Sequence, residues 1–110
     1  MTVSSIFETA ISGLNAAGRQ AHVAANNIVN INTDGFTPSE VRQSTVYASP
    51  GRASGVQAEV FDTERTDAGR EGSLVRDFIT LIAAREAYAA NIATIETADR
   101  LSRDSIDLLA

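Results

Sequence analysis

Two long segments with helical periodicity, one near each end of the chain, constrain the fold of this 110-residue sequence more than any other feature. In the first, apolar residues recur at alternating intervals of three and four, which places them on one face of an α-helix. They are Phe7, Ala10, Leu14, Ala17, Ala21, Ala24, Ile28 and Ile31. This pattern is a heptad seam, and a helix over residues 5–31 would be about 40 Å long at 1.5 Å per residue.

Local signals predict where this first helix begins and ends. Residues 5–8, SIFE, have the form of a capping box, in which a hydroxyl and a carboxylate satisfy the free amides of a helix N-terminus. Gly35 is placed to act as the helix C-cap in a left-handed conformation, and Pro38 prevents the helix from continuing.

The second periodic segment contains neither glycine nor proline from residue 73 to residue 110. Its apolar heptad register contains Leu74, Phe78, Leu81, Tyr88, Ile92, Ile95, Ile106 and Leu109. Arg85, Asp99 and Ser102 interrupt this register. With Ser73 as the expected N-cap, a continuous helix would be about 55 Å long.

The composition between the two periodic segments favours β-structure and loops. Residues 55–60, GVQAEV, alternate between apolar and polar, as in a strand, and residues 41–47 are a weaker strand candidate. Residues 62–72, DTERTDAGREG, are strongly charged and are expected to be a loop. The predicted fold is mainly α: two long antiparallel terminal helices form a coiled-coil-like pair with a small β-hairpin insertion. The corresponding segments are residues 1–36, 37–72 and 73–110.

The expected helices are too long and too rich in alanine to form a self-sufficient domain. A compact chain of this length has a radius of gyration near 13 Å, roughly, so a helix of about 55 Å extends beyond it. Four alanines in the first seam allow the helices to approach closely but bury little apolar area. We therefore expect the chain to be a subunit of an assembly, with further stabilisation supplied by other chains.

The chain lacks the residues that characterise several functional classes. The chain has no cysteine and one histidine, His22, and it contains no P-loop, no GxGxxG motif and no cluster with metal-ligand spacing. Nine scattered arginines and a net charge of −5 disfavour nucleic acid as a partner. No apolar run approaches the roughly 20 residues of a transmembrane helix, and the first residues do not resemble a cleaved secretory signal. We expect no enzyme activity, no cofactor and no metal.

Asparagines are unusually frequent where the first helix is expected to end, in residues 24–36, AANNIVNINTDGF. Asparagine is a poor helix former because its amide competes for backbone hydrogen bonds. One hypothesis is that Asn26, Asn27 and Asn30 simply belong to a frayed helix end. The other is that they lie on a packed flank and form inter-subunit or inter-helix hydrogen bonds.

Residues 25–36, ANNIVNINTDGF, resemble the N-terminal signature of bacterial flagellar rod and hook axial proteins, A-N-N-I-A-N-x-N-T-x-G-F/Y. Residues 12–16, SGLNA, resemble the family's S-G-L/M stretch. Residues 87–91, AYAAN, and 95–99, IETAD, are similar to its closing helix. Because the middle segment is short, the resemblance is nearest to the small proximal rod proteins.

This resemblance implies a structural subunit of the flagellar basal-body rod, whose N- and C-terminal helices pack together and order on assembly. It implies other rod subunits and the flagellar type III export apparatus as partners. The location implied is the periplasm-spanning rod, reached without a cleaved signal peptide. The alternative function is a helical adaptor or export-associated regulator that does not polymerise.

On this basis we expect an assembly interface formed by the two helix seams and the asparagines. Its expected residues are Leu14, Ala17, Ala21, Ala24, Asn26, Asn27, Ile28, Asn30, Ile31, Leu81, Tyr88, Asn91, Ile92 and Ile95.

Overall fold

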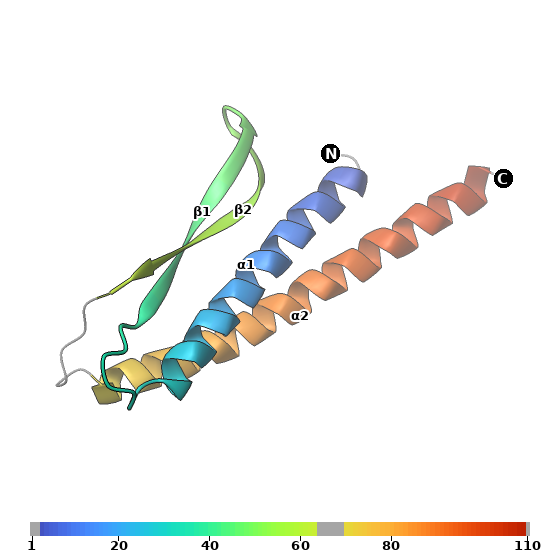
Figure 1. Ribbon diagram of the computed structural model, residues 1–110. Coiled ribbons are helices and arrows are strands. Elements are labelled where there is room, and N and C mark those ends of the chain that lie inside the picture. The colour runs from blue at the N-terminus through green and yellow to red at the C-terminus, as the bar shows by residue number, and fades with distance from the viewer. Residues whose placement is uncertain (1–2, 64–69, 110) are drawn as a thin grey trace.

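The computed structural model describes residues 3–63 and 70–109, with side chains described for residues 4–63 and 73–109. Helix α1 covers Val3–Val29, strand β1 Ser39–Ser49, strand β2 Arg52–Asp62 and helix α2 Arg70–Leu109 (Figure 1). The strands pair in an antiparallel hairpin, with Val41 opposite Val60 and Ser44 opposite Gln57. The predicted fold, two long helices flanking a small β-hairpin, is confirmed. The predicted charged loop falls partly on residues 64–69, outside the described residues.

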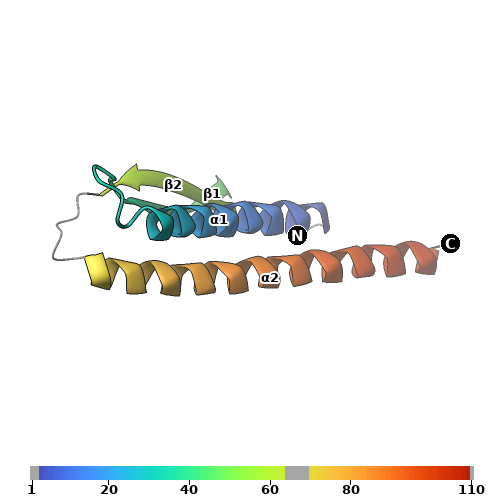
Figure 2. The ribbon, with the colours of Figure 1, turned by 60° about the horizontal axis from the view of Figure 1, so that its bottom comes forward.

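Helix α1 is the middle layer of the molecule, with the hairpin on one side and α2 on the other (Figure 2). The molecule is elongated, with a radius of gyration of 18.0 Å and extents of 63 × 28 × 17 Å. A compact chain of about this length would have a radius of gyration of about 13 Å. The expectation that the long helices extend beyond a compact globule therefore holds.

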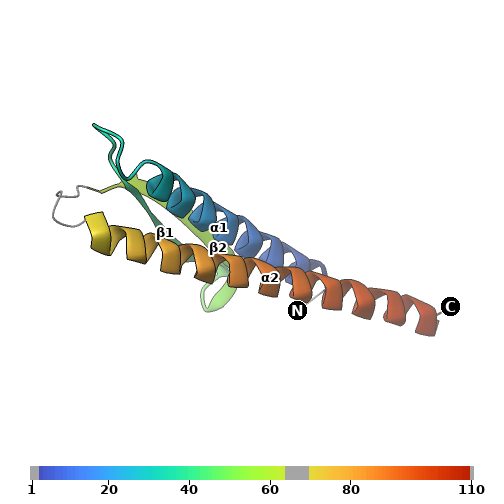
Figure 3. The same ribbon diagram turned by 90° about the horizontal axis from the view of Figure 1, so that it is seen from below.

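The two helices run antiparallel in one continuous register. Near one end of the pair the side chains of Asn27 and Asp77 are bonded, and Gly13 lies against Asn91 midway. Ile6 shares a hollow with Ala98 near the other end. In this register Val3 is level with Leu101, so residues 102–109 of α2 continue past the described part of α1 (Figure 3).

Both helices begin earlier than the capping signals predicted. Helix α1 starts at Val3 and α2 at Arg70, so Ser5 and Ser73 lie inside the helices and are not their N-caps. Within α1 the Thr9 hydroxyl donates to the Ser5 carbonyl over 2.9 Å. The predictions were wrong because a capping pattern is a local preference, and residues before it that tolerate helical geometry allow the helix to start upstream.

Helix α1 also ends two residues before the predicted Ile31. After Val29 the chain continues in turns, and the Phe36 amide donates to the Thr33 carbonyl over 3.2 Å. Gly35 has a φ of +76°, which suits the third position of a type II turn. The left-handed conformation was anticipated, but Gly35 closes a turn in the loop beyond α1 and does not cap the helix itself.

The interface between the helices consists mainly of small side chains. The buried apolar residues in the described part of the chain are Ala10, Ala16, Ala17, Val23, Ala24, Ala84 and Ala98. No large side chain there falls below 2% exposure. The α2 face against α1 is centred on Asp77, Ala84 and Ala98, whereas Phe78 and Ile106 are exposed. Tyr88, Ile92 and Leu109 of the predicted heptad register are exposed as well, so that register was wrong at five of its eight apolar positions.

Alanine substitution at the two glycines of α1 should distinguish the effect of close helix packing on stability from the effect of helix propensity. Replacing Gly18 should raise the free energy of unfolding by about 1 kcal/mol, because a Cβ there has no neighbour within 4 Å. Replacing Gly13 should raise the free energy of unfolding clearly less, since its Cβ would lie 2.7 Å from Oδ1 of Asn91. Thermal unfolding followed by circular dichroism measures both changes.

The double variant Gly13→Ala/Asn91→Ala serves as the control and should recover the gain in helix propensity. Equal stabilisation by the single changes at Gly13 and Gly18 would show that α1 and α2 do not approach closely at Gly13.

Candidate assembly site

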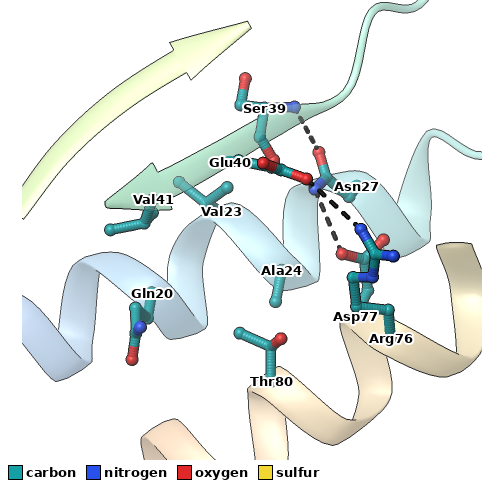
Figure 4. Close-up of a pocket in the computed structure, with 10 residues that line it drawn as sticks. All are labelled: Gln20, Val23, Ala24, Asn27, Ser39, Glu40, Val41, Arg76, Asp77 and Thr80. Atoms are coloured by element: carbon teal, nitrogen blue, oxygen red, sulfur yellow. Dashed lines mark hydrogen bonds and ion pairs between the residues drawn. The ribbon is translucent and has the colours of Figure 1, made fainter. Parts of the chain in front are cut away.

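A buried amide at the end of α1 joins three elements. Asn27 is 3% exposed, and its Nδ2 donates to the Ser39 carbonyl over 2.8 Å. The Ser39 amide donates back to Oδ1 of Asn27 over 3.0 Å, and Nδ2 also donates to Oδ1 of Asp77 over 3.4 Å (Figure 4). Asn27 thus bonds both backbone groups of a β1 residue, as a neighbouring strand would, and links α1, β1 and α2.

The surroundings of Asn27 are polar. Asp77 of α2 is buried beside it, and the Arg76 guanidinium lies 3.6 Å from the Glu40 carboxylate across the opening. The Arg76 and Glu40 side chains are both substantially exposed, so their ion pair contributes little to stability. A cavity of about 270 Å³ lies here, bordered also by Gln20 and Thr80. Within residues 3–63 and 70–109, no group of three or more His, Cys, Asp or Glu residues is arranged to hold a metal ion.

The other two asparagines of the motif form bonds within the end of α1. Nδ2 of Asn30 donates to the carbonyl oxygen of Asn26 over 2.9 Å and to its side-chain Oδ1 over 3.1 Å. The Thr33 hydroxyl donates to Oδ1 of Asn30 over 3.3 Å. Asn27 thus forms an inter-helix bond, whereas Asn26 and Asn30 bond to each other at the end of α1. Hydrogen bonds from these asparagines to other subunits stay a prediction.

A polar stripe along α1 holds the hairpin, and the sequence analysis missed it. The Thr9 hydroxyl donates to the Ser54 carbonyl over 2.9 Å, and the Val56 amide donates to Oγ of Ser12 over 3.0 Å. Arg19 donates to the Ala58 carbonyl over 3.2 Å. These bonds satisfy backbone groups along the outer edge of β2, which would otherwise be open to pairing with another strand.

The residues of this stripe have a helical spacing in the sequence, but that spacing alone does not identify their role. Thr9, Ser12, Arg19 and Asn27 lie at intervals compatible with one face of a helix, beside the apolar seam. Polar residues on such a face are ordinarily solvated, so only a strand packed against them gives the pattern its meaning.

The expected interface residues divide by exposure. Ala17, Ala24 and Asn27 are buried, whereas Asn26, Tyr88 and Ile92 are exposed. Between these extremes are Leu14, Ala21, Ile28, Asn30, Ile31, Leu81, Asn91 and Ile95. The seams of α1 and α2 thus face each other within one chain, and Leu14 and Tyr88 border one hollow with His22.

Large apolar side chains instead collect on the outside of α2. Val75, Phe78, Ile79 and Ile82 are between 48% and 62% exposed. Leu101, Ile106, Leu108 and Leu109 are between 55% and 88% exposed. No helix in the described residues is long and apolar enough to cross a membrane.

Comparison with known protein families finds a match to the N-terminal part of the chain. Residues 7–37, which contain most of α1 and the asparagine motif, match the family model of the flagella basal body rod protein. The match covers 31 of the 110 residues, so it shows the likeness of this N-terminal segment to that family. This match agrees with the resemblance noted in the sequence. None of the curated proteins matches the chain.

The Asn27 contacts can be tested against Asn26 as a matched control. Asn27→Ala should lower the free energy of unfolding by about 1–3 kcal/mol, since it leaves buried polar partners unsatisfied. Asn26→Ala should change it by less than about 0.5 kcal/mol, as at most exposed sites. Urea unfolding of the two variants provides the measurement, and equal effects would refute the role of Asn27 as the link between elements.

Proposed function

We propose that the protein is an axial structural subunit of the flagellar rod that assembles through α1 and α2. One observation carries this proposal: the buried apolar core of the described residues is six alanines and one valine, while fifteen large apolar side chains are exposed. Burying apolar surface is the main source of stability, at about 25 cal/mol per Å². Assembly with other rod subunits would supply the burial that the single chain lacks.

The shape and connectivity support the same role. The molecule is an elongated rod of parallel layers, 63 Å in its longest dimension, so several copies or related chains can pack side by side along their helices. The insertion between the helices is a single hairpin, which favours the small proximal rod proteins within the family. We further propose export by the flagellar type III apparatus, without a cleaved signal peptide, to the periplasm-spanning rod.

A charge placed at an exposed site of the expected interface should block assembly without unfolding the chain. Ile92 of α2 is 39% exposed, so the isolated helix pair should tolerate Ile92→Asp. Within an interface an unpaired charge costs several kcal/mol, so incorporation into basal bodies should be lost. Ser44→Asp, on the exposed part of β1, is the matched control and should be incorporated normally.

Incorporation is measured by detecting the chain in purified basal bodies, with circular dichroism to verify that each variant is helical. Normal incorporation of Ile92→Asp would exclude this position from the interface. Absence of the wild-type chain from basal bodies would favour the non-polymerising adaptor instead.

The free chain should be least stable at the end of α2. Residues 102–109 have no described α1 residues beside them, and isolated helical segments of this length are marginal in water. In dilute monomer their amides should exchange with solvent far faster than those of residues 77–98, and exchange should slow on assembly. Hydrogen exchange measures this, and strong protection through Leu109 in a verified monomer would contradict the prediction.

A further inference from the structure

The connection between α1 and β1, residues 30–38, contains a pair of residues that is chemically labile. Asp34 is the only aspartate in the sequence that is followed by glycine, and no asparagine is followed by glycine. Because glycine has no side chain, the carboxyl of the preceding aspartate can approach the next backbone amide without obstruction. The connection is a loop that extends beyond the end of α1 (Figure 3).

Both reacting groups of this pair are accessible. Asp34 and Gly35 are exposed, and a Cβ built on Gly35 would have no neighbour within 4 Å. In the described part of the chain, neither the Asp34 carboxylate nor the Gly35 amide takes part in a hydrogen bond or ion pair. The turn around them is closed by the bond from the Phe36 amide to the Thr33 carbonyl, which at 3.2 Å is long. Opening this exposed turn therefore costs little.

Two other exposed aspartates are followed by amides that are held in hydrogen bonds. Thr63, after Asp62, donates its amide to the Pro38 carbonyl over 2.8 Å. Ser105, after Asp104, lies inside α2, where each amide donates to the carbonyl four residues before it. An amide held in this way reaches the neighbouring carboxyl only after local unfolding. The Asp-Gly pair is free of this restriction.

We propose that Asp34 is a site of spontaneous isomerisation to isoaspartate. The Gly35 nitrogen attacks Cγ of the protonated Asp34 carboxyl, and the hydroxyl leaves with the amide hydrogen as water. The attack is intramolecular, so the two groups react at high effective concentration. Water then adds to one of the two carbonyl carbons of the resulting cyclic imide and breaks its bond to nitrogen. Opening at the main-chain carbonyl gives isoaspartate, whereas opening at Cγ restores aspartate.

Isomerisation changes the segment that leads from α1 to the Asn27 junction. In isoaspartate the main chain passes through Cγ, so the backbone between α1 and β1 gains one carbon atom. The side-chain carboxylate is replaced by an α-carboxylate, and the ring closed by the Phe36 amide becomes larger. Because Asn27 bonds both backbone groups of Ser39, the modification alters the connection that holds Ser39 against α1.

Ageing of the purified chain in dilute solution, at neutral pH and physiological temperature, tests the proposal. An isoaspartyl methyltransferase, which transfers a methyl group from S-adenosylmethionine to isoaspartate, measures the amount formed. Electron-transfer fragmentation of the tryptic peptide of residues 20–42 locates it. Isoaspartate should form at Asp34 about tenfold or more faster than at Asp104, because the Ser105 amide is released only by local opening of α2.

Two matched variants serve as controls. Asp34→Glu lengthens the side chain by one methylene, which disfavours ring closure, and should abolish methyl acceptance. Asp104→Glu makes the same change in α2 and should leave methyl acceptance unaltered. Methyl acceptance that persists in Asp34→Glu would overturn the proposal. So would an Asp34 that stays unmodified while a synthetic peptide of residues 31–38, INTDGFTP, isomerises. Because the aged chain is unassembled, the result is independent of the proposed rod function.

Discussion

Close approach of α1 and α2 is the constraint on which the rest of the structure depends. Small or short polar residues recur every seven positions at the contact: Ala10, Ala17 and Ala24 on α1, and Asp77, Ala84, Asn91 and Ala98 on α2. Such residues let two backbones lie near each other, but they leave no room for large side chains between them. The large apolar residues are therefore displaced to the flanks and to the outer side of α2, where they depend on other chains for burial.

The same constraint explains which parts of the fold could be predicted. Both helices and the hairpin follow from periodicity and composition, and β2 was predicted from the alternation of residues 55–60. The register of α2 was only partly predicted, since hydrophobic patterns are dominated by large residues such as Phe78, whereas this interface selects small ones. Helix ends failed at Ser5 and Ser73 because capping preferences amount to about 1 kcal/mol and the surrounding chain overrides them.

The candidate site was predicted in part. Sequence placed three asparagines near a packed flank, but neighbouring positions on a helix point in different directions, and only Asn27 faces the junction. Its partners, Ser39 and Asp77, lie 12 and 50 residues away, and no local pattern joins them. The bonds from α1 to β2 were missed for the same reason, because they depend on where the hairpin packs.

The turn that joins β1 and β2 lies away from the contact between α1 and α2. Pro50 and Gly51 are exposed, and Gly51 has a φ of +78°, as expected at the third position of a type II turn after proline. The hairpin packs on α1 and the helix pair forms on the other side of that helix (Figure 1). Extra sequence introduced between Pro50 and Gly51 would lengthen the ribbon at its outer end without altering the α1–α2 contact. This turn is therefore a site at which a reporter peptide, or an entire additional domain, could be inserted.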